Sequence, residues 1–246
     1  MNQNNESVSS KKNTPLLPCT VIQSVVCFVI GFFGLYGFSL IFSLLPLGND
    51  PAIINFLTYL TLIIVFLIYL WNSKLLKPIL KSFNPDSIVF GIGMGIALVA
   101  GSIMISEFCG FIGEHFGIVK EMGENDNQEL INNAILAYPV LSFLMTCIFA
   151  PIAEELTYRV GLFGGIAKHN KILGYVVAVL FFGLIHFNFA SENMANELLN
   201  LPSYLFAGFM LAFTYGKNGD ISSSMVAHAF NNTLSFVLSF LLPYLQ

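Results

Sequence analysis

Long stretches without a charged residue dominate this sequence and limit what it can fold into. There are seven of them, and each reaches or approaches the roughly 20 residues that a helix needs to cross a bilayer's hydrocarbon core. Only 10% of all residues are charged, against about 25% in a typical soluble domain. The sequence therefore predicts an all-α, polytopic transmembrane bundle, with helices at about 20–45, 52–71, 88–112, 137–166, 172–188, 201–216 and 221–244.

A single membrane domain is predicted for residues 20–246, preceded by a tail. Residues 1–19 are rich in Asn, Ser and Lys, which predicts a disordered tail. With this tail in the cytoplasm, nine of the ten Lys and Arg residues fall on the inner side, and only Lys120, in the acidic loop 114–129, falls outside. This bias predicts a cytoplasmic N-terminus. The frequent use of Asn, Ile and Phe is typical of AT-rich bacterial genomes, so we expect a bacterial cell membrane.

Polar and ionisable side chains within the apolar runs mark the candidate site. They are Glu154, Glu155, Arg159, His186, His228 and Asn232. A charged side chain at the centre of a bilayer costs roughly 2.5–3.5 kcal/mol on insertion scales, so such residues usually serve a function. At 1.5 Å per residue, Glu154 and His186 lie roughly 23–25 Å from the turn between their helices, which predicts a common depth.

The two glutamates are expected to have different roles. Adjacent residues point about 100° apart on a helix. Glu155 has Arg159 four residues on, and we predict an ion pair with an orienting role. Glu154 has no counter-charge in its own helix, which suits a general base for water. Pro151, three residues earlier, predicts a kink that frees a backbone carbonyl beside the site.

Three roles are possible for the two histidines. His186 and His228 could orient a water, bind a metal or donate a hydrogen bond to an oxyanion. Asn232 shares a helix face with His228 and suits an oxyanion hole. Glu154 and the two histidines would also suffice as the three protein ligands of a catalytic zinc. The residues do not choose between zinc and metal-free chemistry. We expect no nucleotide, no organic cofactor and no nucleic-acid partner.

Three short motifs resemble those of the CPBP intramembrane proteases. This family includes the type II CAAX prenyl endopeptidases and bacteriocin self-immunity ("Abi") proteins. Residues 154–159 match E-E-x-x-x-R, residues 182–186 match F-x-x-x-H, and residues 228–232 match H-x-x-x-N. The motifs occur in the family's order and in separate apolar segments. The resemblance covers about residues 137–240, where we expect the protease core.

The resemblance implies a reaction and roles. Glu154 and His186 would activate a water, His228 and Asn232 would stabilise the transition state, and Phe182 would pack against the ring of His186. The implied activity is hydrolysis of peptide bonds in a membrane-associated or lipidated peptide or protein, as in CAAX processing. The implied enzyme is a metalloendopeptidase if a divalent metal such as zinc is bound.

Two other classes of function remain open. A family member can act by binding, as a bacteriocin-immunity protein or a regulatory membrane scaffold. Intramembrane Glu and His residues also serve small transporters and proton relays. The intact motif set favours a protease over a scaffold, and the lack of a detectable sequence repeat weighs against a transporter. The sequence names neither the substrate nor the oligomeric state.

Overall fold

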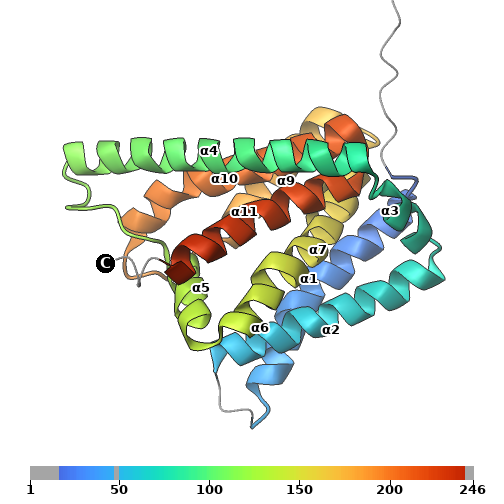
Figure 1. Cartoon of the computed structure of the whole chain (residues 1–246), viewed down its shortest axis with the longest axis horizontal. Coiled ribbons are helices and arrows are strands. Elements are labelled where there is room, and N and C mark those ends of the chain that lie inside the picture. The colour runs from blue at the N-terminus through green and yellow to red at the C-terminus, as the bar shows by residue number, and fades with distance from the viewer. Residues whose placement is uncertain (1–16, 47–49, 242–246) are drawn as a thin grey trace, which may run out of the picture.

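The computed structural model describes residues 17–46 and 50–241, and within them every regular element is a helix (Figure 1). Most of the predicted tail, residues 1–16, lies outside the described residues. Its last residues are packed: Leu17 and Cys19 are buried, and the Lys168 ammonium donates to the Cys19 carbonyl. The packed domain therefore begins slightly before the predicted boundary at residue 20.

Five helices among the described residues are long and apolar enough to cross a membrane. They are α1 (Val21–Ser43), α2 (Pro51–Asn72), α4 (Pro85–His115), the composite helix Pro139–Ala167 and α10 (Met194–Asn218). The other two predicted segments are also helical. α9 (Lys171–Ile185) is shorter, and α11 (Ile221–Leu241) carries Ser, Asn and His side chains, which lower its hydropathy. The predicted all-α membrane bundle is confirmed.

Two shorter helices lie between the long ones. α3 (Leu76–Ser82) follows α2, and α5 (Asp126–Ala137) precedes the composite helix. The sequence predicted a loop over 114–129, whereas α5 begins within it. Its first turn is capped by Asn125, whose side chain accepts from the Gln128 N–H at 3.0 Å. The mixed polar and apolar composition of α5 hid it from a search for apolar runs.

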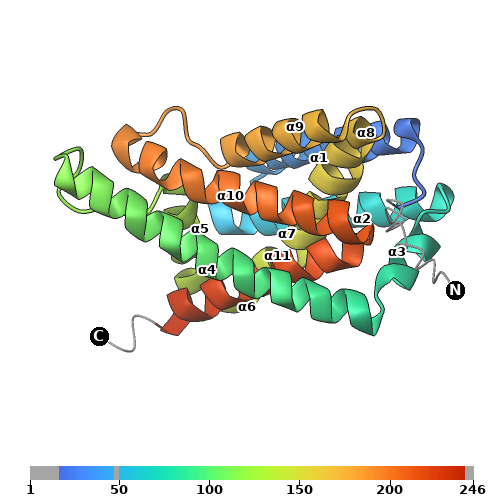
Figure 2. The same ribbon diagram turned by 90° about the horizontal axis from the view of Figure 1, so that it is seen from above.

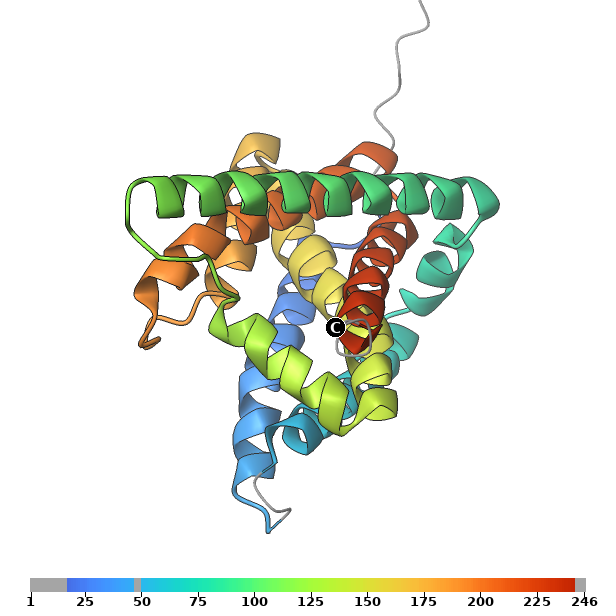
Figure 3. The same ribbon diagram turned by 60° about the vertical axis from the view of Figure 1, so that its left-hand side comes forward.

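The composite helix lies at the centre of the bundle. Its parts are α6 (Pro139–Phe143), η1 (Leu144–Phe149), α7 (Ala150–Glu154), η2 (Glu155–Phe163) and α8 (Gly164–Ala167). In its most apolar window 56% of the residues are buried, against 11–28% in the other four candidate spans. Figure 3 shows it between α1 and α11. Side chains of the composite helix can therefore contact neighbouring helices on more than one side.

Close helix contacts depend on glycine at two positions. A Cβ on Gly91 of α4 would lie 2.7 Å from the Ser223 carbonyl oxygen of α11. A Cβ on Gly161 of η2 would lie 2.7 Å from the Phe28 backbone nitrogen of α1. Both distances are shorter than any allowed contact, so the helices could not pack this closely around a larger residue. These contacts hold α4 against α11, and α1 against the composite helix.

Candidate active site

The composite helix changes its hydrogen-bond register just before the glutamates. In η1 the Ala150 N–H donates to the Met145 carbonyl, five residues back, which is the π-helical pattern. In that register the Thr146 carbonyl would accept from residue 151, but Pro151 has no N–H. Asn232 of α11 takes its place, with Nδ2 donating to the Thr146 carbonyl at 2.9 Å. The carbonyl that the proline frees is thus satisfied by a motif residue.

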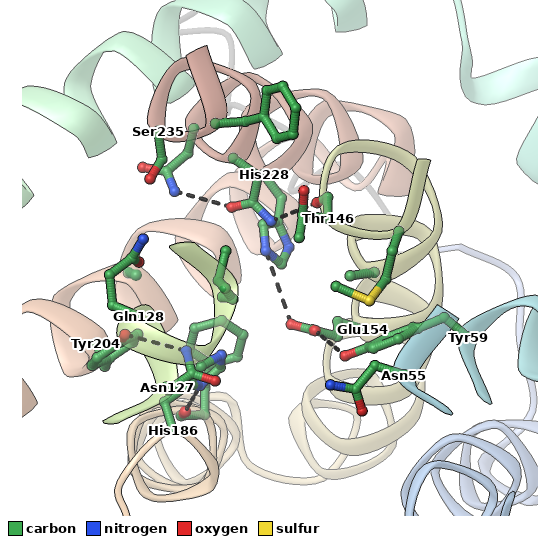
Figure 4. Close-up of a pocket in the computed structure, with 18 of the residues that line it drawn as sticks. Asn55, Tyr59, Asn127, Gln128, Thr146, Glu154, His186, Tyr204, His228 and Ser235 are labelled. Atoms are coloured by element: carbon green, nitrogen blue, oxygen red, sulfur yellow. Dashed lines mark hydrogen bonds and ion pairs between the residues drawn. The ribbon is translucent and has the colours of Figure 1, made fainter. Parts of the chain in front are cut away.

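A cavity of about 370 Å³ opens beside this helix (Figure 4). Its walls come from α1, α2, α4, α5, the composite helix, α9, α10 and α11. The side chains of Glu154, His186, His228 and Asn232 all line it, together with Phe182. The structure thus brings these motif residues to one cavity, and their common depth in a membrane stays a prediction. Most functional pockets are concave, with a few convergent polar groups, as here.

The two oxygens of Glu154 have different surroundings. Oε1 accepts a hydrogen bond from the Tyr59 hydroxyl of α2 at 2.8 Å. Oε2 is shielded and has no hydrogen-bond partner among the described residues. It points toward His228, whose Nε2 lies 3.9 Å away, too far for a direct hydrogen bond (Figure 4). A separation of this size is one that a bridging water can span.

The second glutamate, Glu155, binds the ring nitrogen of His228 that lies away from Glu154. The Nδ1 atom of His228 lies 2.9 Å from Glu155 Oε1, so the proton on Nδ1 is donated to the carboxylate. The other oxygen of Glu155 accepts from the Ser224 hydroxyl and lies 3.3 Å from Nε of Arg159. The predicted ion pair between Glu155 and Arg159 is therefore present, and both residues are fully buried. This arrangement leaves Nε2 of His228 directed at the cavity.

The Phe182 ring contacts the buried arginine and both histidines. The Arg159 guanidinium carbon lies 4.4 Å from the Phe182 ring centroid, a cation–π contact. The same ring packs against His186 at 4.7 Å and against His228 at 6.0 Å between centroids. The predicted contact between Phe182 and His186 is thus present. Phe182 lines the cavity, whereas Glu155 and Arg159 do not.

His186 is fixed by a second set of contacts. It follows directly on the last residue of α9, and its Nδ1 donates to the Phe182 carbonyl at 2.8 Å. Its ring stacks on Tyr204 of α10, with 4.8 Å between centroids. Its own carbonyl accepts from Asn125, which in turn accepts from the Tyr204 hydroxyl. With Nδ1 engaged, Nε2 is the ring nitrogen left for chemistry.

The donor types of a zinc site are present in this cavity. Glu154, His186 and His228 are suitable ligands, and both histidines have Nδ1 anchored, as histidine ligands usually do. As placed, however, no three His, Cys, Asp or Glu side chains among the described residues come close enough together to hold an ion.

Several cavity residues were not singled out from the sequence. Tyr59 lies in the apolar run of α2, and Tyr204 lies in α10; an isolated tyrosine in such a run is usually an interfacial residue. Asn127 and Gln128 lie in the segment expected to be a loop. All four line the cavity (Figure 4). No spacing relates them to the motifs, so only the helix packing could reveal them.

Comparison with known proteins finds a family resemblance over the region that contains the motifs. Residues 136–234 match the model of a family described as type II CAAX prenyl endopeptidase Rce1-like, which confirms the resemblance seen in the motifs. The matched region includes every motif residue, from Glu154 to Asn232.

Bacterial relatives extend this match beyond the core. An uncharacterized protein of Mycoplasma capricolum is 30% identical over 176 residues, which cover 68% of this chain and 45% of that protein. A putative membrane peptidase, YdiL, of Bacillus subtilis is 25% identical over 221 residues, which cover 85% and 84%. The UPF0177 protein YvdC of Lactococcus lactis is 25% identical over 193 residues, which cover 78% and 67%. No solved structure matches the chain. Together with the apolar helices, these matches support an integral membrane protein whose residues 136–234 resemble type II CAAX prenyl endopeptidases.

Proposed function

We propose that this membrane protein, whose residues 136–234 are Rce1-like, is an intramembrane endopeptidase. Its substrate would be a membrane-associated or lipidated peptide or protein, and the nucleophile a water activated by Glu154. One observation carries the proposal. The unpartnered Oε2 of Glu154 faces Nε2 of His228 across 3.9 Å in a cavity, while both side chains are held from behind.

The first step is attack by water. Oε2 of Glu154 takes a proton from the water while the water oxygen bonds to the carbonyl carbon of the scissile peptide. The Tyr59 hydroxyl, which donates to Oε1, keeps the carboxylate in one orientation. Nε2 of His186 accepts the water's other hydrogen and so aligns it. The π electrons of the peptide carbonyl move onto its oxygen, and a tetrahedral oxyanion forms.

Two residues of α11, His228 and Asn232, stabilise the oxyanion. When His228 carries a proton on both nitrogens, Glu155 stabilises its charge and Nε2 donates to the oxyanion. Asn232 uses one amide hydrogen for the Thr146 carbonyl and has the second available for the same oxyanion. The intermediate then collapses, the C–N bond breaks, and the leaving nitrogen takes the proton from Glu154. The new carboxylic acid then gives its proton to the amine, so the products are a carboxylate and an ammonium group.

The orientation in the membrane is part of this proposal. The lysines of the described residues, apart from Lys120, lie at the end of the bundle formed by α3, the α8–α9 turn and the end of α10: Lys74, Lys77, Lys81, Lys168, Lys171 and Lys217. In Figure 2 this end is on the right, and α5 and the end of α4 are on the left. A cytoplasmic lysine-rich end places α5, and with it the cavity wall, toward the outer side of a bacterial membrane.

A comparison of membrane peptides tests the proposal. Membranes carrying the parent protein should contain new peptide N-termini that membranes carrying Glu154→Gln lack, with cleavage reduced by roughly 10²–10⁴. Glu129→Gln is a matched control, because Glu129 is exposed on α5 and does not line the cavity. Rescue of a deletion strain by Glu154→Gln as complete as that by the parent would contradict the protease and favour a binding scaffold.

A further inference from the structure

Glu197 is a buried carboxylate that the proposed mechanism does not use. It lies in the first turn of α10 and is 1% exposed. A carboxylate at this place in a helix usually faces water or the free N–H groups of its own first turn. Glu197 instead accepts from two other segments, with Oε1 bound to the Asp126 N–H at 2.9 Å and Oε2 to the Asn188 N–H at 3.0 Å. It therefore joins α10 to the start of α5 and to the chain that follows α9.

Both of these segments lead directly to His186. Asn188 comes two residues after it, where the chain has left α9. Asp126 follows Asn125, a buried residue whose side chain donates to the His186 carbonyl at 3.3 Å. The Asn188 side chain also donates to the Asp126 carboxylate at 2.6 Å. The backbone on both sides of this junction is thus fixed by contacts that converge on Glu197.

His186 depends on such contacts because its own helix ends beside it. α9 ends at Ile185, and the next helix, α10, begins only at Met194. The last carbonyls of a helix have no partner within it, and a helix end without outside bonds frays readily. The bond to Asn125 satisfies the His186 carbonyl, and the bond to Glu197 holds the chain two residues further on.

The junction requires an acid at position 197. Each oxygen of the carboxylate accepts one backbone N–H, whereas a glutamine of the same size has only one acceptor and would turn its NH₂ group toward the other N–H. Burial of a carboxylate is costly, and no Lys, Arg or His in the described part of the chain forms an ion pair with Glu197. The two backbone donors supply charge-assisted hydrogen bonds in place of a cation.

We infer that Glu197 is a positioning residue, which fixes the backbone of His186 against α5 and so sets the distance from the His186 ring to the attacking water. The inference rests on the proposed protease function, in which Nε2 of His186 aligns that water. α5 also supplies Asn127 and Gln128 to the cavity wall. Loss of the Glu197 carboxylate therefore displaces His186 without removing any group that touches the substrate.

Glu197→Gln in the full-length protein tests the inference. Asp220→Asn is the matched control, because Asp220 accepts from the Ser87 hydroxyl at 2.7 Å beyond the other end of α10. Glu197→Gln should lower kcat about 10- to 100-fold per folded protein, whereas Asp220→Asn should keep the parent kcat even when its melting temperature falls as far. In a His186→Ala background, Glu197→Gln should cost less than about twofold, because it acts through the ring already removed.

Asn125→Asp changes the same junction without touching Glu197. Its carboxylate can still accept from the Gln128 N–H and the Tyr204 hydroxyl, but it cannot donate to the His186 carbonyl. It should therefore lower kcat in the same direction, also on a protein that keeps the cap of α5.

Nitrogen-15 NMR of histidine-labelled protein gives a readout that needs no cleavage. The chain has four histidines, and His186→Ala identifies the ring signals of His186. Glu197→Gln should shift these signals and leave those of His115 and His169 in place, and Asp220→Asn should shift none of them. Unchanged His186 signals, or an equal loss of kcat with and without the His186 ring, would overturn the inference. A parent protein that cleaves nothing would contradict the protease, whereas a selective shift of the His186 signals would still support Glu197 as the residue that places this ring.

Discussion

The Asn232 side chain donates to the Thr146 backbone carbonyl at 2.9 Å, across 86 residues of sequence. This bond exists because η1 shifts the helix register and Pro151 offers no N–H to that carbonyl. It ties α11 to the helix that carries Glu154 and orients the amide toward the cavity. Asn232 therefore combines a structural bond with the proposed oxyanion contact, and the two can be separated.

Asn232→Ala should lower both stability and cleavage. An unsatisfied buried carbonyl costs about 1–3 kcal/mol, and loss of one oxyanion donor lowers the rate up to about 10²–10³-fold. Adding Pro151→Ala restores a backbone N–H for Thr146, so the double variant should regain melting temperature without regaining cleavage. If cleavage returned together with stability, Asn232 would be structural only.

Arg159→Ala should destabilise the protein. Removing one partner of a buried ion pair costs roughly 3–5 kcal/mol, because the carboxylate of Glu155 is left without compensation. Arg159→Lys, the matched variant, keeps the charge but loses the planar contact with Phe182, and we expect a stability between the two. Thermal unfolding in detergent measures the order. An Arg159→Ala protein as stable and active as the parent would refute the orienting role.

Tyr59→Phe should lower kcat about tenfold, equivalent to about 1.4 kcal/mol, with KM unchanged. The reason is that its hydroxyl donates to Glu154 Oε1 and so holds the proposed base in place. Tyr69→Phe removes a hydroxyl from the same helix, one that donates to the Gln23 carbonyl away from the cavity. This control should keep the parent kcat. Equal kcat values for all three proteins would show that the carboxylate needs no such support.

Cleavage should persist in the presence of chelators, since the described side chains do not bring three ligands to one ion. Metal analysis of purified protein should then give the same low zinc content for the parent, His186→Ala and His169→Ala, the last being a histidine in the turn between α8 and α9. About one equivalent of zinc in the parent and in His169→Ala, but not in His186→Ala, would establish the metal-dependent alternative.

Reporter fusions after Lys81 and after Glu124 should report opposite sides of the membrane. The two positions lie at opposite ends of α4, and the lysine bias places the first in the cytoplasm. Activity of the same reporter at both positions would contradict the proposed topology, and reversed sides would place the cavity wall formed by α5 in the cytoplasm.

Much of the fold follows from the sequence because the membrane imposes a simple requirement. A stretch of about 20 uncharged, mainly apolar residues must form a helix to satisfy its backbone in lipid. Such stretches predicted all seven long segments. The rule does not apply to α5, which is amphipathic, and it does not distinguish an α-helix from the π-helical segments η1 and η2. Those depend on local register and on packing against neighbours.

For the site, the sequence determined which residues of one helix can act together. Spacing of four residues places Glu155 with Arg159 and His228 with Asn232, and the cost of polar groups in lipid marks them as functional. The tertiary structure decided which groups meet across helices. Tyr59 reaches Glu154, and Glu155 reaches His228. These contacts depend on how separate helices pack and rotate against each other, which spacing along one chain does not encode.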